Sequence, residues 1–530
     1  MSHWITLPVV LPALVAAVII LLARYHVQIQ RVLSVASSVA LVVICAGLAW
    51  RASDGTVDVY TLGNWAAPFG IVLVADRLST YMTLLLALLT LPVVLYAIGA
   101  RWDERGRHLH ALFQLQVMGV MGAFLTGDAF NLFVFFEILL IASYGLMVHA
   151  GGRARLRAGT QYVLYNLLGS TLFLFALGTI YAETGTLNMA DLAGRIAAIP
   201  PGEDAGIRVA AVLLLMVFAL KGAIAPLQFW LPGSYANAPG PVAAFFAIMT
   251  KVGAYAIIRA YTLFFPPYLD VTQGLHTVWL MPVALASIVI GMVGVLGAKR
   301  LDRLVAFSVV GSMGMVASAI AVFTETGIAA ALYYIAHSTF ATGLLFLTVD
   351  LVKRGLRHDD LSLNPRGPIP SEAAVAGLFF AGAIAMAGLP PLSGFIGKLL
   401  VLDASYASPL VWWVWAVVLG SSLVAVIGFS RAGSAVFWKS HELTGEAADH
   451  AAPATDPDDR PTRLELVSVG LLLAALVAIT AAAGPMLRYM ETTAAALMNP
   501  APYIEAVMSS TGKDLSGGYD DTDPDTEEAE

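Results

Sequence analysis

Charged residues and cysteine are both scarce in this 530-residue chain. Only 12% of the residues are charged and 58% are hydrophobic, whereas about a quarter of an average soluble domain is charged. A soluble fold could not hide so much apolar surface, so we expect a membrane protein. The single cysteine, Cys45, lies in an apolar run. It therefore excludes a disulfide framework and any cysteine-ligated cluster formed by this chain alone.

Several motifs of nucleotide and metal binding are also missing. The sequence has no P-loop, no dinucleotide-binding fingerprint and no Cys cluster, which argues against ATP-driven pumping and electron transfer by this chain. No ionisable residues in its apolar stretches have the spacing of metal ligands on one helix face, and no Ser/His/Asp set is identifiable. We therefore predict no cofactor, no metal and no enzymatic activity.

The sequence does contain long apolar stretches. About 20 apolar residues cross the hydrocarbon core of a bilayer as a helix, and alternating barrel strands are absent. The first eight residues carry no Lys or Arg, so a signal peptide is not expected and the first stretch should remain as a span. We predict an all-α polytopic membrane protein with about 14 transmembrane helices. The spans are expected near residues 4–22, 32–50, 79–99, 111–126, 130–149, 160–182, 208–230, 241–264, 278–297, 303–323, 328–350, 373–400, 411–437 and 464–486.

Basic residues alternate between the loops of this scheme. They gather in alternate loops, beginning with Arg24 and Arg31 in the first loop and including Lys299 and Arg300 in the ninth. Of these alternate loops, only the short seventh, around residues 235–238, carries no basic residue. Cytoplasmic loops carry such an excess of Lys and Arg. We therefore predict a multi-pass membrane protein with both termini, and an acidic, polar C-terminal tail, outside the cytoplasm.

Two spans are interrupted by proline. One break follows Lys221 around Pro226, and the other contains Pro390 and Pro391. Proline removes a backbone donor, and in lipid the freed carbonyl must face protein or water. The alternatives are simple kinks and a pair of broken helices at equivalent places in two repeats, which would mark a transporter's ion site. The break falls in the fourth helix of spans 4–8 and again of spans 9–13, which favours two inverted five-helix repeats.

The chain thus divides into six parts. The expected units are N-terminal helices 1–3 (1–110), the first repeat (111–264), the second inverted repeat (278–437), a cytoplasmic loop (438–463), a C-terminal helix 14 (464–486) and a polar acidic tail (487–530).

Two opposite charges lie deep in the predicted spans. A charge near the bilayer centre costs at least about 3 kcal/mol, so each one needs a reason. Glu137 lies near the middle of the fifth span, and Lys221 is about as deep in the seventh. One interpretation is a Glu/Lys pair that only fixes helix packing. The other is a coupled titration, in which the lysine releases its proton when its carboxylate partner moves or is neutralised.

Three further residues continue this series in the eighth, eleventh and twelfth spans. Lys251 could snorkel to the nearer face, and a lone buried histidine such as His337 is usually a hydrogen-bonded core residue. However, acids and bases strung across the midplane are what proton translocation needs, and histidine titrates near neutral pH. We therefore predict one proton relay, formed by Glu137, Lys221, Lys251, His337 and Lys398.

The remaining ionisable residues of the spans lie near span ends, where solvated or snorkelling positions are expected. They are weaker candidates for a role in transport. These residues are Arg259, Glu325, Asp350, Asp403 and Arg431.

Five sequence motifs follow one another over roughly residues 60 to 440. They are Phe136-Glu137-Ile138-Leu139 with Ser143-Tyr144, Leu220-Lys221-Gly222 through Pro232, Lys251-Val252-Gly253, Lys299 through Leu304, and Gly388-Leu389-Pro390-Pro391 through Lys398. As a set they resemble the proton-conducting antiporter-like subunits. That family is shared by respiratory complex I, membrane-bound hydrogenases and the Mrp-type multisubunit cation/proton antiporters. The sequence around Glu137 is most similar to that of the Mrp D subunit.

The resemblance implies roles for the buried charges. Glu137 and Lys221 match the family's key Glu/Lys pair, Lys251 its bridging lysine, His337 its central histidine and Lys398 its terminal lysine. It further implies a proton-translocating subunit of a Na⁺ or K⁺/proton antiporter in the bacterial cell (inner) membrane. The implied partners are other subunits of a hetero-oligomeric complex and no nucleic acid. The alternatives are a proton-pumping subunit of complex I (NADH-quinone oxidoreductase) or of a membrane-bound hydrogenase, a non-conducting scaffold, and a single-chain solute carrier.

Overall fold

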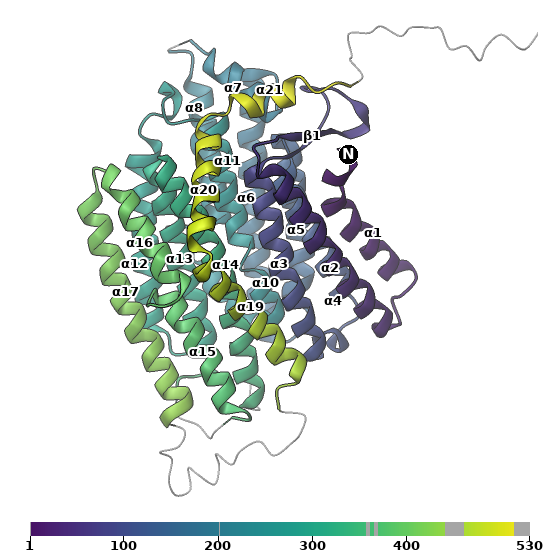
Figure 1. Ribbon diagram of the computed structural model, residues 1–530, viewed down its shortest axis with the longest axis vertical. Coiled ribbons are helices and arrows are strands. Elements are labelled where there is room, and N and C mark those ends of the chain that lie inside the picture. The colour runs from purple at the N-terminus through teal and green to yellow at the C-terminus, as the bar shows by residue number, and fades with distance from the viewer. Residues whose placement is uncertain (1, 201, 357–360, 365–368, 440–459, 513–530) are drawn as a thin grey trace, which may run out of the picture.

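The chain folds into a bundle of long helices (Figure 1). The computed structural model describes residues 2–200, 202–356, 361–364, 369–439 and 460–512. In this part of the chain, 10 helices are long and apolar enough to span a membrane, and shorter apolar helices accompany them. The predicted all-α polytopic membrane fold is confirmed.

The elements follow the predicted order along the chain. The N-terminal helices are α1 (Leu7–Leu21), α2 (Val27–Ala52) and α3 (Arg77–Gly99). The first repeat comprises α4 (Leu109–Leu125), α5 (Ala129–Met147), α6 (Arg153–Thr184), α8 (Ala205–Lys221) with α9 (Trp230–Asn237), and α10 (Gly240–Phe245) with α11 (Met249–Leu263). The second comprises α12 (Met281–Gly297), α13 (Leu301–Val322), α14 (Glu325–Gly355), α15 (Glu372–Ala387) with α16 (Ser393–Ala404), and α17 (Val411–Gly433). In the described residues, the other α-helices and strands are β1 (Asp58–Thr61), β2 (Val72–Ala75), α7 (Met189–Ala197), α19 (Arg463–Ala481), α20 (Ala483–Met498) and α21 (Ala501–Met508).

The two five-span units pack in the same pattern. In the first, α5 contacts both α4 and α6, and α6 contacts both halves of the broken helix, α8 and α9. In the second, α13 contacts both α12 and α14, and α14 contacts both α15 and α16. Because each unit has an odd number of spans, a chain that crosses the membrane at every span runs through the two units in opposite directions.

Both predicted helix breaks are present, and proline explains them. Residues 222–229, which include Pro226, separate α8 from α9. Residues 388–392, which include Pro390 and Pro391, separate α15 from α16. A proline has no backbone N–H, and its ring clashes with the preceding turn of a helix. The breaks leave carbonyl groups at the ends of α8 and α15 without helical partners, so side chains are needed to satisfy them.

The helix α14 is the centre of the second unit and of the bundle. It packs against α10, α13, α15, α16, α19 and α20. The most apolar stretch of this helix is fully buried inside the protein. A side chain on α14 is therefore shielded from lipid and can face the interior of the bundle.

One end of the bundle carries elements that the sequence did not predict. The strands β1 and β2 pair antiparallel, with Asp58 opposite Ala75. The helices α7 and α21 lie at the same end of the molecule as this hairpin (Figure 1). We call this end the hairpin face. Its loops are among those that the charge pattern predicts to lie outside the cytoplasm.

The C-terminal helices extend further than expected. A span was expected to end at residue 486, but α20 continues to Met498 and α21 follows it. Together α19 and α20 cross the front of the bundle obliquely and lead to the hairpin face (Figure 1). The extension is stabilised because one side of α20 is buried and packs against α14. Most of the predicted loop (440–459) and the end of the predicted tail (513–530) lie outside the described residues.

Candidate functional site

Glu137 lies in the middle of α5 and is half-buried. Its Oε1 atom is buried and has no hydrogen-bond partner within the described part of the chain. No ion pair within 4 Å joins it to Lys221, so the direct contact that the sequence suggested is not made. The two charges nevertheless lie within electrostatic range of each other.

Lys221 is the last residue of α8 and is only 6% exposed. Its Nζ atom lies 5.7 Å from the ring centroid of Phe136, the residue just before Glu137. Phe136 and Lys221 also line a small pocket that includes the polar side chains of Asn166 and Ser170. The pocket has a volume of about 20 Å³, which is enough for one water molecule.

The first break is held by side-chain hydrogen bonds. The indole Nε1 of Trp230, at the start of α9, donates to the carbonyl of Leu220 at 3.0 Å. Beyond the end of α8, the backbone N–H of Ala225 donates to the hydroxyl of Ser287 on α12 at 2.6 Å. These bonds satisfy backbone groups that lipid could not satisfy, so the break is stable inside the bundle.

The helix α11 approaches the end of α8 closely because residue 253 is a glycine. A Cβ atom on Gly253 would lie 2.6 Å from both the backbone nitrogen of Gly222 and the carbonyl oxygen of Phe218. This approach places the first turn of α11, which carries Lys251, beside the first break. Lys251 is fully buried, and its Nζ atom lies 3.5 Å from the hydroxyl of Thr250.

His337 lies on α14, and its two ring nitrogens have different surroundings. Nδ1 is 3.0 Å from the hydroxyl of Ser393, the first residue of α16. Nε2 is buried and has no hydrogen-bond partner among the described residues. Gly394 permits this arrangement, since a Cβ atom there would lie 2.8 Å from Cε1 of His337 and 1.9 Å from the carbonyl oxygen of Ala385. The imidazole can therefore take up or release a proton at Nε2 while Nδ1 stays bonded to the second break.

Lys398 caps the second break. Its Nζ atom donates to the carbonyl of Ala387, the last residue of α15, at 2.6 Å and to the hydroxyl of Ser422 on α17 at 2.9 Å. Gly388 has a positive φ of 79°, and a Cβ atom there would lie 2.5 Å from Cδ of Lys398. The glycine thus provides both the turn and the space for the lysine side chain.

The five predicted residues fall into two groups. Glu137 and Lys221 lie near the first break, and His337 and Lys398 lie at the second. Lys251 stands on the helix that packs against the first break, and the charges of Lys251 and Lys398 both act on His337. Lys251 therefore lies within electrostatic range of the second group, and it stands near the first group because α11 packs against the end of α8. No direct hydrogen bond links one of these five residues to the next.

Two of the residues expected to be solvated at span ends are in fact buried. Arg259 is 3% exposed and Asp350 is 4% exposed. The carboxylate of Asp350 accepts hydrogen bonds from the Tyr96 hydroxyl and the Trp102 indole, both at 3.0 Å. Buried partners on distant helices thus replace water. The other three residues are exposed, as expected: Glu325, Asp403 and Arg431.

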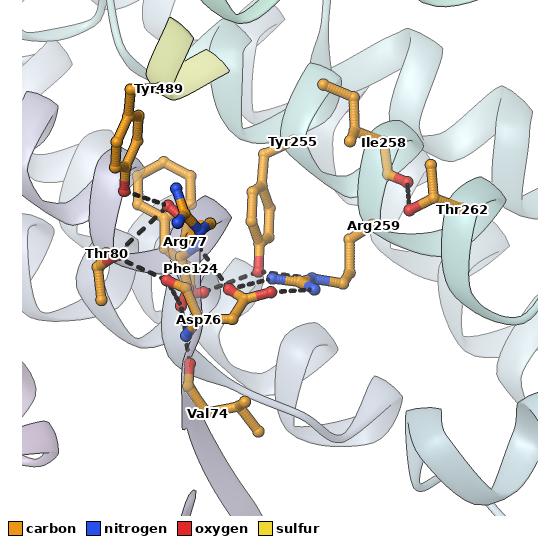
Figure 2. A network of polar contacts seen from close by, with 11 residues as sticks. Val74, Asp76, Arg77, Thr80, Phe124, Tyr255, Ile258, Arg259, Thr262 and Tyr489 are labelled. Carbon is orange, nitrogen blue, oxygen red and sulfur yellow. Dashed lines mark hydrogen bonds and ion pairs between the residues drawn. The ribbon is translucent and has the colours of Figure 1, made fainter. Parts of the chain in front are cut away.

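Arg259 forms a bidentate ion pair that sequence reasoning missed (Figure 2). Both of its terminal nitrogens lie 2.7 Å from the carboxylate oxygens of Asp76, which precedes α3. The Nε atom of Arg259 also lies 3.4 Å from the hydroxyl of Tyr255. A signal was available, because Lys251, Tyr255 and Arg259 recur every four residues and so share one face of a helix.

The chain matches a family model over residues 126–424, which is more than half of its length. That model is described as "NADH:quinone oxidoreductase/Mrp antiporter, TM". The chain belongs to this NADH:quinone oxidoreductase/Mrp antiporter family. The sequence resemblance to this family is confirmed.

Members of the NADH:quinone oxidoreductase/Mrp antiporter family align with nearly the whole chain. The D subunit of a probable K⁺/H⁺ antiporter from Rhizobium meliloti is 38% identical, with 96% of this chain and 98% of the relative covered. The D subunit of a Na⁺/H⁺ antiporter from Bacillus subtilis is 35% identical, with 96% of this chain and all of the relative covered. The predicted resemblance to Mrp-type D subunits is therefore confirmed.

Solved structures of the family have the same fold. A chain of the Mrp complex from a Dietzia species superposes with a TM-score of 0.85 at 28% identity, covering 96% of this chain and 99% of that one. A chain of respiratory complex I from Thermus thermophilus superposes with a TM-score of 0.77 at 24% identity, covering 96% and 100%. The second comparison supports the fold alone.

Proposed function

We propose that this chain is the proton-translocating subunit of a multisubunit antiporter that exchanges H⁺ for Na⁺ or K⁺. The observation that carries the proposal is the series of buried acids and bases at two helix breaks. The relatives named as D subunits of K⁺/H⁺ and Na⁺/H⁺ antiporters support it, because they align over nearly their full length.

The first half of the proposed path is a coupled titration of Glu137 and Lys221. While Glu137 carries its negative charge, it stabilises the ammonium form of Lys221 through the low-dielectric interior. A proton that neutralises Glu137 removes this stabilisation, and Lys221 then releases its own proton. The 20 Å³ pocket beside Lys221 has room for a water molecule to accept that proton and pass it towards Lys251.

The second half of the proposed path uses the two nitrogens of His337. A proton from the direction of Lys251 is taken up at the unpartnered Nε2, and another leaves from Nδ1 on the side of Ser393 and Lys398. Uptake at Nε2 gives the imidazolium, and release from Nδ1 then returns the ring to a neutral state with the other tautomer. At the second break, the backbone carbonyl of Ala387 accepts a hydrogen bond from Lys398 and so positions its amine to receive the proton.

The loop charges support one orientation for this path. With both termini outside the cytoplasm of a bacterial cell, the hairpin face is the outer face and the basic loops lie inside.

The relay is tested by removing the two charges of its first half. We expect Glu137→Ala and Lys221→Ala each to abolish cation-dependent proton flux in everted vesicles, while the complex still assembles in the membrane. Arg157→Ala, at an exposed position of α6, is the matched control and should leave flux unchanged. Full flux in the Lys221→Ala complex would contradict the proposal.

A further inference from the structure

A second set of buried polar groups lies on α11, outside the relay. Lys251, Tyr255 and Arg259 follow one another at intervals of four residues, so each lies about 6 Å further along the helix and on nearly the same face. This stripe runs from Lys251, in the first turn of α11, to Arg259, which pairs with Asp76. Figure 2 shows Tyr255, Arg259 and Asp76 at this end of the stripe. All three side chains of the stripe are at most 3% exposed.

The pair at the end of the stripe is expensive to bury. Moving a carboxylate and a guanidinium out of water costs several kcal/mol per ion, and apolar residues of the same size often stabilise a protein at least as well. The carboxylate also caps α3, because Oδ1 of Asp76 accepts the backbone N–H of Ser79 at 2.8 Å. An Asn at position 76 would preserve that cap, so the cap alone does not explain the charge.

A pocket connects this pair with the hairpin face. Asp76, Arg77 and Arg259 line it, and Tyr503 of α21 forms part of its wall, with its ring 5.0 Å from the guanidinium carbon of Arg259. The pocket has a volume of about 110 Å³, which is enough for several water molecules. Asn499, between α20 and α21, lies at its exposed rim.

Tyr255 stands between the pair and Lys251. Its hydroxyl donates to the carbonyl of Phe124 at 2.7 Å and lies 3.4 Å from Nε of Arg259. Its ring packs edge-on against the ring of Phe124. The hydroxyl is thus the polar group that follows the ion pair on the way from the pocket into the bundle.

We infer that the Asp76–Arg259 pair and Tyr255 form a gate through which protons pass between the pocket at the hairpin face and Lys251. The inference rests on the proposed proton relay and gives it an opening on this face. Asp76 takes a proton from pocket water, and its neutral carboxyl then attracts Arg259 less strongly. The carboxyl O–H bond breaks as the proton moves on through water and the Tyr255 hydroxyl to the Lys251 amine, and Asp76 returns to its charged form. The same steps run in reverse for release.

Three single variants test the gate in the assembled complex. Asp76→Asn keeps the helix cap, Arg259→Gln removes the other charge, and Tyr255→Phe removes only the hydroxyl. We expect each to lower cation-dependent proton flux in everted vesicles, by about tenfold or more for the two charge variants, because an unpaired charge now blocks the gate. Asp191→Asn, which breaks an exposed ion pair with Arg195 on α7, should leave flux within about twofold of the wild type.

The double variant Asp76→Asn/Arg259→Gln distinguishes a proton gate from an ion pair that only holds two helices together. If the pair only holds α3 to α11, the neutral pair should restore both assembly and flux, since matched neutral groups often replace a buried pair without loss. A gate predicts that the double variant assembles, as measured by copurification, but still transports about tenfold less than the wild type. Restored flux would overturn the inference.

The relay variants, measured in parallel, keep the two proposals distinct. If Glu137→Ala and Lys221→Ala lose flux while the gate variants retain it, the gate fails and the relay stands. If the relay variants themselves retain flux, the proposed function fails.

Discussion

At the scale of single residues, the two breaks depend on glycines that let helices touch. Gly253 allows α11 to meet the end of α8, and Gly394 allows α16 to meet α14 at His337. Each glycine stands close to a relay residue in its own five-span unit. The sequence predicts the relay residues, because a charge inside an apolar run is a local signal. It does not predict the role of these glycines, because that role is set by helices distant in the chain.

Gly394→Ala should disturb the second break. Its Cβ atom would lie 1.9 Å from the Ala385 carbonyl oxygen, a backbone atom that cannot move aside cheaply. We expect overpacking to destabilise the protein by about 1–3 kcal/mol. The measurements are the Tm of the purified complex and its proton flux, both of which should fall.

Gly420→Ala on α17 is the control for this substitution. No atom of the residues that the structure describes lies within 4 Å of a Cβ atom at that position, so the alanine should be neutral or slightly stabilising in the helix. An unchanged Tm and flux for Gly394→Ala would show that the close approach of α16 to α15 and α14 is not needed.

At the scale of helices, the breaks were predictable and their caps were not. Proline marks a break wherever it falls in a span, whereas the partner of an orphaned carbonyl depends on how the chain returns. The helix α20 was missed for a related reason. Only one side of it is apolar, so it lacks the continuous run that identifies a span, and its burial comes from packing on α14.

Trp230→Phe tests the cap of the first break. The variant keeps an aromatic ring but removes the side-chain donor to the Leu220 carbonyl, which also accepts the backbone N–H of Ala223. The lost hydrogen bond should cost about 1 kcal/mol. Because Lys221 is the next residue, we expect proton flux to fall several-fold while the complex remains assembled.

Trp412→Phe on α17 is the matched control, since that side chain is 79% exposed. Equal flux in the two tryptophan variants would show that the position of Lys221 does not depend on this hydrogen bond.

At the scale of the whole molecule, the apolar runs and the equal number of spans in the two units predicted the polytopic fold, and the alternation of basic loops predicts its orientation in the membrane. An error in the predicted end of any one span changes these signals little, because they are summed over many loops and spans. The Asp76–Arg259 pair could not be predicted in the same way. Its members belong to different helices, 183 positions apart, and each alone resembles an ordinary residue at a span end.

The proposed assembly makes a prediction about the chain in isolation. Expressed alone in a host without cation/proton antiporters, it should insert into the membrane but support no cation-dependent proton flux. Affinity purification of a tagged chain from its native membranes should recover further membrane subunits. Transport by the isolated chain would identify a single-chain carrier, and copurified iron–sulfur or quinone-binding subunits would indicate a redox complex.

The buried position of Cys45 has a practical consequence for spectroscopy. The thiol is fully enclosed in α2, and the chain contains no second cysteine. Dyes or spin labels can therefore be attached at introduced cysteines without first removing a reactive native thiol. Phe229, in the first break, and Tyr406, beyond α16, are both exposed and suit such a pair of labels. Distances recorded between them during turnover would report how the two units move.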